Sequence, residues 1–208
     1  MNSPRPHDLL WGMAPAMLPD DAPQWARQVL AAGAPVVVRR AECADGWVAV
    51  GVRGLQRAQR LACLMPLAAI QERLSPEAVR SHRAAAECAA WSALQALASV
   101  GPVLDALGLA WGPTGGVAYQ LASGIEVLHA ESDLDLLLRT PQPLARTAAK
   151  DLLDILDCAP CRIDLQLQTP AGAVALREWA GPARRVMLKA TRCAALVIDP
   201  WAALEHAA

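Results

Sequence analysis

The amino-acid sequence predicts a mixed α/β fold in two domains, with a mixed sheet flanked by helices in the C-terminal domain. The 208 residues are 54% hydrophobic and 19% charged, which suits one large or two small globular domains with buried cores. Segments with strand-like and helix-like patterns follow one another on both sides of an Ala-rich stretch. We expect the N-terminal domain to span residues 1–75 and the C-terminal domain residues 76–208.

The N-terminal domain is expected to contain a helix followed by a strand hairpin. The helix begins near Pro23 and ends at Gly33, because Pro favours the first helical turn and Gly ends helices. Two apolar strands follow at residues 35–40 and 47–53, joined by a turn that contains Asp-Gly. This pattern predicts a small helix-hairpin unit.

The middle of the chain is expected to be helical. Ser75 is a good N-cap and Pro76 is a good first helical residue. Ala-rich sequence follows, and Gly101-Pro102 is expected to break the helix before one more short helix at residues 102–107.

The C-terminal domain is expected to alternate short strands and helices. The expected elements are an apolar strand at 109–111, a Gly-rich turn at 112–116, a helix that ends at Gly124, a strand at 132–138, a helix at 143–156, a strand at 162–168 that forms a hairpin with 173–176, and short apolar segments at 186–188 and 194–198.

Three carboxylates are the candidate catalytic residues. Asp133 and Asp135 are two residues apart in an expected strand, so both side chains project from the same face. Two adjacent acids repel, so the pair is stable at a solvated strand end or next to a cation, and oxygen ligands favour Mg²⁺. Asp164 lies on the polar face of the next expected strand. A Gly-rich turn whose backbone N–H groups can approach phosphate precedes these acids, so the set suits metal-bound phosphate chemistry such as nucleotidyl transfer.

Composition excludes several classes of protein. The formal net charge is −1, which gives no overall positive field for nonspecific nucleic-acid binding. The longest apolar run covers residues 61–70, whereas a membrane span needs about 20 residues. No signal peptide is visible at the N-terminus, so we expect a cytoplasmic protein with reduced cysteines. Cys158 and Cys161 have redox or zinc-like spacing, but nothing completes a zinc site, so a structural or incidental role is favoured.

Several motifs together resemble a known family. Gly115-Gly116, the Asp-x-Asp of SDLDLLL and the later Asp164 resemble the nucleotidyltransferase superfamily, whose pattern is Gly-Ser, Asp-x-Asp and a third acid on a neighbouring strand. Nearly the whole chain resembles the phosphoribosyl-dephospho-CoA transferases of malonate decarboxylase, also called holo-acyl-carrier-protein synthases. The resemblance is carried by RPHDLLW, PVVVRR, VGVRGLQRAQR, LHAESDLDLLL, RIDLQLQTPAGAVALREWA, MLKATR and DPW.

The resemblance implies a nucleotidyltransferase-like C-terminal domain and a specific transfer reaction. The donor would be 2'-(5''-triphosphoribosyl)-3'-dephospho-CoA, the acceptor a serine of the acyl-carrier subunit of malonate decarboxylase, and the by-product pyrophosphate. Asp133 and Asp135 would hold Mg²⁺ at the reacting phosphate. Asp164 would complete the metal site or help to deprotonate the serine. Gly116 stands where the superfamily has Ser.

The expected substrate-binding residues are Gly115, Gly116, Lys189, His129, Arg53 and Arg57. Lys189 matches the family, and two interpretations of it stay open: a phosphate ligand, or a solvated residue on a strand face. His129 precedes the acid pair. It either contacts phosphate or one of the carboxylates, or is a surface or packing residue. Two interpretations also stay open for Arg53, Arg57 and Arg60. They either contact CoA-like phosphates or the acidic carrier subunit, or form a solvated helix face.

Two other functions stay open at this point. One is a nucleotidyltransferase that acts on a different acceptor. The other is a catalytically degenerate module that binds the carrier protein, which Gly116 suggests because it lacks the hydroxyl of the superfamily Ser.

Overall fold

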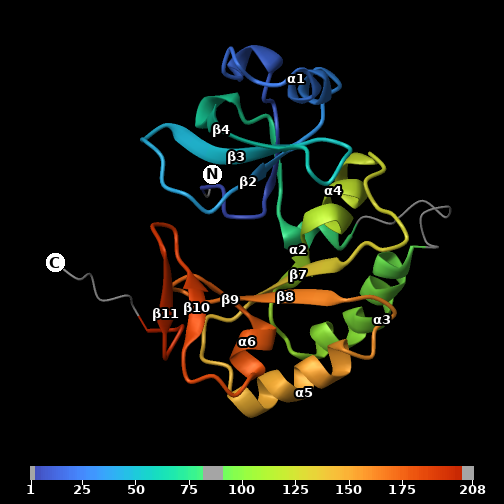
Figure 1. Cartoon of the computed structure of the whole chain (residues 1–208), viewed down its shortest axis with the longest axis vertical. Coiled ribbons are helices and arrows are strands. Elements are labelled where there is room, and N and C mark those ends of the chain that lie inside the picture. Colours follow the sequence, from blue (N-terminus) through green and yellow to red (C-terminus); the bar gives the residue numbers. More distant parts are fainter. Residues whose placement is uncertain (1–2, 82–90, 203–208) are drawn as a thin grey trace. The chain divides into compact units, whose positions relative to one another are not determined.

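The computed structural model, which describes residues 3–81 and 91–202, contains two compact units (Figure 1). Among these residues, the first unit comprises 3–81 and 118–127, and the second comprises 91–117 and 128–202. Each unit is built on its own sheet. The predicted mixed α/β class is therefore confirmed, while the division of the sequence at residues 75 and 76 stays a prediction.

The first unit contains a five-stranded sheet in which all neighbours are antiparallel, with the strand order β4-β3-β2-β1-β5. Its elements are β1 (Leu9–Trp11), η1 (Pro15–Met17), α1 (Gln24–Ala31), β2 (Val36–Val38), β3 (Trp47–Arg53), β4 (Arg60–Pro66), η2 (Leu67–Ala69), β5 (Glu72–Leu74) and α2 (Pro76–Val79). The predicted helix and the two predicted strands are confirmed as α1, β2 and β3. Ala26 and Leu30 of α1 are buried against the valines of β2 and β3, and this burial fixes the helix on the sheet.

The arginine-rich segment after β3 is a hairpin turn. Arg53 ends β3 and Arg60 begins β4, and these two residues are paired in the strand register. The Gly54 backbone N–H donates to the Gln59 carbonyl oxygen at 3.0 Å and closes the turn that contains Arg57. One interpretation of this segment was a solvated helix face. That interpretation is wrong, because Arg53 and Arg60 belong to strands β3 and β4, which pair over seven residues.

The second unit contains a six-stranded mixed sheet, with the order β11-β10-β9-β8-β7-β6. Strands β7 and β8 are parallel and the other neighbours are antiparallel. Its elements are α3 (Ser92–Ala106), β6 (Trp111–Pro113), β7 (Leu134–Arg139), α5 (Arg146–Leu156), β8 (Ile163–Gln168), β9 (Ala173–Ala175), α6 (Leu176–Ala180), β10 (Val186–Lys189) and β11 (Ala194–Val197). Helix α4 (Gly115–Ser123) begins in this unit, and its residues from 118 onward belong to the first unit. The predicted strand-turn-helix, the strand-helix-strand and the β8–β9 hairpin are confirmed. Helix α5 connects the two parallel strands, as parallel pairing requires.

The predicted break at Gly101-Pro102 is wrong, because α3 runs through both residues. Val100 and Leu104 lie one turn apart and are both buried, so packing of this face keeps the helix continuous although Pro102 donates no backbone hydrogen bond. Most of the predicted Ala-rich helix before residue 91 lies outside the described residues.

A buried carboxylate connects β1 and β5, the first and last strands of this sheet along the chain. The Asp8 side chain is 0% exposed and lies 3.6 Å from Arg73 Nε, and it accepts a 2.9 Å hydrogen bond from the backbone N–H of Arg5. A buried charge that loses its partner destabilises a fold strongly. This contact therefore contributes to the stability of the sheet edge formed by β1 and β5.

We expect Arg73→Met to lower the free energy of unfolding by about 2–3 kcal/mol, because the buried Asp8 carboxylate then loses the positive charge that lies 3.6 Å from it. Denaturant unfolding followed by circular dichroism measures the change. Lys150→Met is the matched control, since it removes one partner of an exposed pair on α5 and should cost below about 0.5 kcal/mol. Equal effects of the two substitutions would contradict a special role for the buried pair.

The described residues carry no feature of a membrane span or of a disulfide pair. No helix in this part of the chain combines the length and the apolar character needed to cross a bilayer. Cys158 and Cys161 are free thiols at the end of α5. Burial and the nearby Asp133 carboxylate raise the pKa of Cys161, whereas reactive thiols have a lowered pKa. Cys88 lies outside the described residues.

Candidate functional site

The three predicted acids converge at the N-terminal ends of β7 and β8, two neighbouring strands inside the second unit's sheet. Asp133 directly precedes β7, Asp135 lies within it, and Asp164 lies on β8 directly opposite Asp135 in the parallel register. One carboxylate oxygen of each acid lies within 4.8 Å of those of the other two. Three carboxylates this close repel one another, and an oxygen-only ligand set of this kind suits a hard cation such as Mg²⁺.

Strand alternation places these acids on one face. On β7, Leu134 and Leu136 are buried while Asp135 is partly exposed, and on β8 Ile163 and Leu165 are buried on either side of Asp164. The apolar side chains anchor both strands in the core of the unit. The parallel register then brings the two acidic faces into line.

The Gly-rich turn lies against the acid cluster. The Thr114 backbone N–H donates to the Asp135 carbonyl oxygen at 2.8 Å, which holds the end of β6 beside β7. Gly115 begins α4 with a φ of +60°, and a methyl group built there would overlap the Asp135 carboxylate, with 2.8 Å to its Cγ atom. Only glycine combines this backbone conformation with this close approach. The start of α4 therefore faces the carboxylates, and Gly116 is the next residue of the helix.

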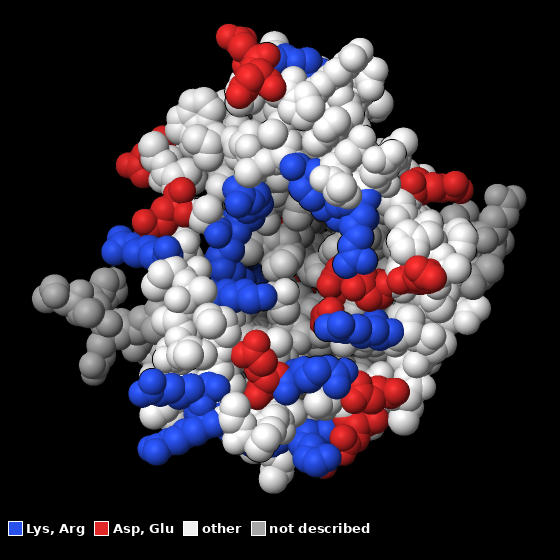
Figure 2. Space-filling view, in the orientation of Figure 1, with Lys and Arg blue, Asp and Glu red and all other residues white. Residues whose placement is uncertain are grey.

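A pocket of about 240 Å³ opens beside Asp135 and Asp164. Its lining includes three cationic side chains, Arg162, Arg177 and Lys189. Acidic and basic groups therefore stand side by side in this pocket. On the face drawn in Figure 2, positive and negative side chains also lie next to one another on the second unit. Such a pocket can hold phosphate groups on its cations and a metal ion on its acids.

Two of these cations are held by carboxylates. Arg162 donates to Asp164 Oδ1 from Nε at 3.1 Å and from Nη2 at 2.9 Å. Arg177 binds both oxygens of Asp157, at 3.2 and 2.5 Å, and its hydrogen bonds lower the pKa of Asp157. These contacts orient the guanidinium groups at the pocket.

Sequence reasoning missed Arg162 and Arg177 as site residues. Arg162 is two residues before Asp164 at the start of a strand, so the same-face rule that paired the acids could have found it. Arg177 comes from α6, and no local pattern connects that helix with β8. Lys189, predicted from the family motif, is exposed at the end of β10 and lines the pocket.

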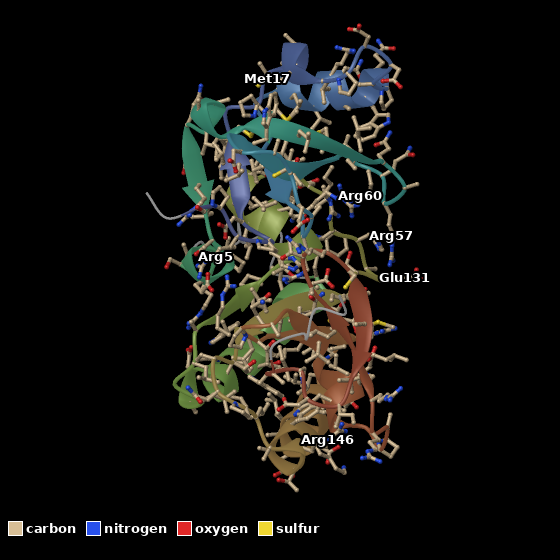
Figure 3. The ribbon with its side chains drawn as sticks, turned by 90° about the vertical axis from the view of Figure 1, so that its left-hand side faces the viewer. Arg5, Met17, Arg57, Arg60, Glu131 and Arg146 are labelled. Atoms are coloured by element: carbon tan, nitrogen blue, oxygen red, sulfur yellow. The ribbon has the colours of Figure 1, made fainter. Side chains whose placement is uncertain are left out.

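The other predicted binding residues lie outside this pocket. His129 is exposed in the loop before Asp133, where its backbone N–H donates to Ser132 Oγ at 3.0 Å and its Nδ1 accepts from the Glu131 N–H at 3.3 Å. These hydrogen bonds hold the loop that precedes β7 in place. Arg53 and Arg57 belong to the first unit, where Figure 3 shows Arg57 and Arg60 at the β3–β4 turn.

Comparisons with known proteins assign the family. Residues 5–76 match the model of the phosphoribosyl-dephospho-CoA transferase MdcG N-terminal domain, and residues 73–200 match the model of the C-terminal domain. The chain is 69% identical to a phosphoribosyl-dephospho-CoA transferase of Pseudomonas putida over 208 residues, which are 100% of both chains. It is 59% identical to the Azotobacter vinelandii transferase over 95% of this chain and 94% of that one. For the Pseudomonas aeruginosa transferase the identity is 56%, over 97% and 96%.

No solved structure was found to match the chain. The two family models nevertheless cover almost all of it, and the Pseudomonas putida relative matches it over its full length. The chain belongs to the phosphoribosyl-dephospho-CoA transferase family.

Proposed function

We propose that this protein transfers the phosphoribosyl-dephospho-CoA group from 2'-(5''-triphosphoribosyl)-3'-dephospho-CoA to a serine of the acyl-carrier subunit of malonate decarboxylase, in the cytoplasm. The observation that carries the proposal is the convergence of Asp133, Asp135 and Asp164 within 4.8 Å beside a pocket lined by cations. The family supplies the transferred group, and the arrangement of acids favours a nucleotidyltransferase type of reaction.

The carboxylates fit Mg²⁺ by their chemistry, since all three offer oxygen ligands on partly exposed strand positions. Asp133 and Asp135 would hold the ion, and Asp164 would either complete the site or help to deprotonate the acceptor serine. When bound, Mg²⁺ would supply positive charge that stabilises the phosphate oxygens of the donor.

The residues of the chain have separate roles in this proposal. Arg162, Arg177 and Lys189 bind the triphosphate oxygens, and the backbone N–H groups at Gly115 and Gly116 add donors. The serine oxygen forms a bond to the phosphorus next to the ribose, and the bond from that phosphorus to pyrophosphate breaks. The serine proton passes to a carboxylate of the cluster, with Asp164 as the candidate base.

The mass of the carrier subunit after incubation with the donor tests the proposal. We expect the mass to rise by one phosphoribosyl-dephospho-CoA group per serine in the presence of Mg²⁺, with release of pyrophosphate. EDTA should stop the transfer, and excess Mg²⁺ should restore it, because without a cation the acids repel the donor's phosphates.

Two control reactions separate the alternatives. ATP replaces the triphosphate donor in one, and a carrier subunit with its acceptor serine changed to alanine replaces the wild type in the other. Transfer of AMP in place of the larger group would identify a nucleotidyltransferase with another substrate. Binding of the carrier subunit without any transfer would identify a degenerate binding module.

A further inference from the structure

The first unit contains a pocket that the proposed chemistry at the acid cluster of β7 and β8 does not use. It has a volume of about 380 Å³, within the range of about 300–1,000 Å³ typical of small-molecule sites. Trp25 and Val29 of α1, Leu55 of the β3–β4 turn and Ile125 line it with apolar surface. All of its lining residues belong to the first unit.

A buried tyrosine gives this pocket a hydrogen-bonding group. Tyr119, on α4, lines the pocket and is 1% exposed. Its hydroxyl is buried and has no hydrogen-bond partner among the described residues. A buried polar group normally has a partner, so this hydroxyl indicates a ligand that supplies one.

Positive charge lies beside the same tyrosine. The Arg53 guanidinium carbon lies over the Tyr119 ring, 5.6 Å from its centroid, and Arg53 also lines the pocket. Arg60 stands opposite Arg53 in the hairpin. Burial raises the pKa of Tyr119, while the charges of Arg53 and then Arg60 act in the lowering direction. Arg53, which lines the pocket, is thus placed to attract an anionic group to it.

We propose that this pocket binds the adenine ring of the dephospho-CoA moiety, with the diphosphate of that moiety toward Arg53. The proposal rests on the function proposed above, because that function supplies an adenine nucleotide. A planar ring matches the aromatic and apolar lining, and its ring nitrogens accept hydrogen bonds of the kind that the Tyr119 hydroxyl can donate. An aliphatic side chain of a protein partner would leave this hydroxyl without a partner.

Binding of dephospho-CoA to the full chain, measured by isothermal titration calorimetry, tests this assignment. We expect dephospho-CoA and ADP to bind, and pantetheine, which lacks adenine, to bind at least about tenfold more weakly. Equal affinity for pantetheine and dephospho-CoA would overturn the assignment.

Two variants place the binding in this pocket. Tyr119→Phe removes only the hydroxyl and should weaken dephospho-CoA binding about five- to tenfold. It should also raise the Tm of the ligand-free protein by about 2–4 °C, since an unpaired buried group is removed. Ala32→Trp, at an exposed lining position just after α1, should fill the pocket and abolish measurable binding. Lys150→Gln, on the exposed face of α5, is the matched control and should leave the affinity unchanged.

The outcome can be separated from that of the transfer assay. Wild-type affinity in either Tyr119→Phe or Ala32→Trp would overturn the pocket assignment even if the enzyme transfers the group. Loss of binding in both variants, with no transfer by the wild type, would support the pocket and overturn the proposed reaction.

Discussion

Replacement of Asp135 by Asn is expected to reduce kcat for prosthetic-group transfer by about 10³-fold. The side chain keeps its size but loses the charge that would hold Mg²⁺ beside the donor's phosphates, and a metal ion contributes several kcal/mol to such a reaction. Asp133→Asn should have an effect of the same order. The initial rate of carrier-subunit modification, followed by mass spectrometry at saturating donor, measures both.

We expect Asp135→Asn to lose activity without losing stability. Asp135 lies within reach of two other carboxylates, so removal of one negative charge relieves repulsion and should leave Tm unchanged or higher. Asp151→Asn, which changes an exposed acid on α5, is the matched control and should retain the wild-type rate. Unchanged transfer by both the Asp133 and the Asp135 variants would remove the acid cluster from the mechanism.

Gly115→Ala is expected to reduce the transfer rate by about 10²-fold and to cost about 1–2 kcal/mol of unfolding free energy. The stability cost arises because a φ of +60° is unfavourable for a residue with a Cβ atom. The larger effect on activity arises because the new methyl group would overlap the Asp135 carboxylate and displace it from the cluster. Transfer kinetics and denaturant unfolding of the same preparation measure the two effects.

Gly108→Ala separates backbone strain from displacement of the acid. Gly108 has a φ of +66° and would have no atom within 4 Å of an added Cβ, so alanine there should cost similar stability but retain the transfer rate. If both glycine variants lose activity to the same extent, the close contact between Gly115 and Asp135 is not what limits the reaction.

Local patterns predicted the elements that carry the site. The alternation of leucines with Asp133, Asp135 and Asp164 indicated two half-buried strands, and the structure contains β7 and β8 at these positions. The structure shows that these two strands pair in parallel, which aligns Asp135 with Asp164. The glycine pair, which forms the start of α4 in the structure, indicated a turn that allows close approach.

Local patterns failed where distant packing decides the structure. Gly101-Pro102 reads as a break, but the buried side chains of Val100 and Leu104 keep α3 continuous. The arginines after β3 were also compatible with a helix, until pairing with β4 placed them in a hairpin. Burial against the rest of a fold contributes more free energy than the propensity of one or two residues.

By itself, the sequence predicted the mixed α/β class and placed three acids on expected strands, because strand alternation and motif spacing are local properties of the chain, and its motifs showed the resemblance to the family. Only the tertiary structure decided that Arg162, Arg177 and Lys189 share a pocket with those acids, and that Tyr119 and Arg53 line another. Tyr119 is 66 residues from Arg53 along the chain. Contacts over such distances depend on how sheets and helices pack, which no local pattern of residues encodes.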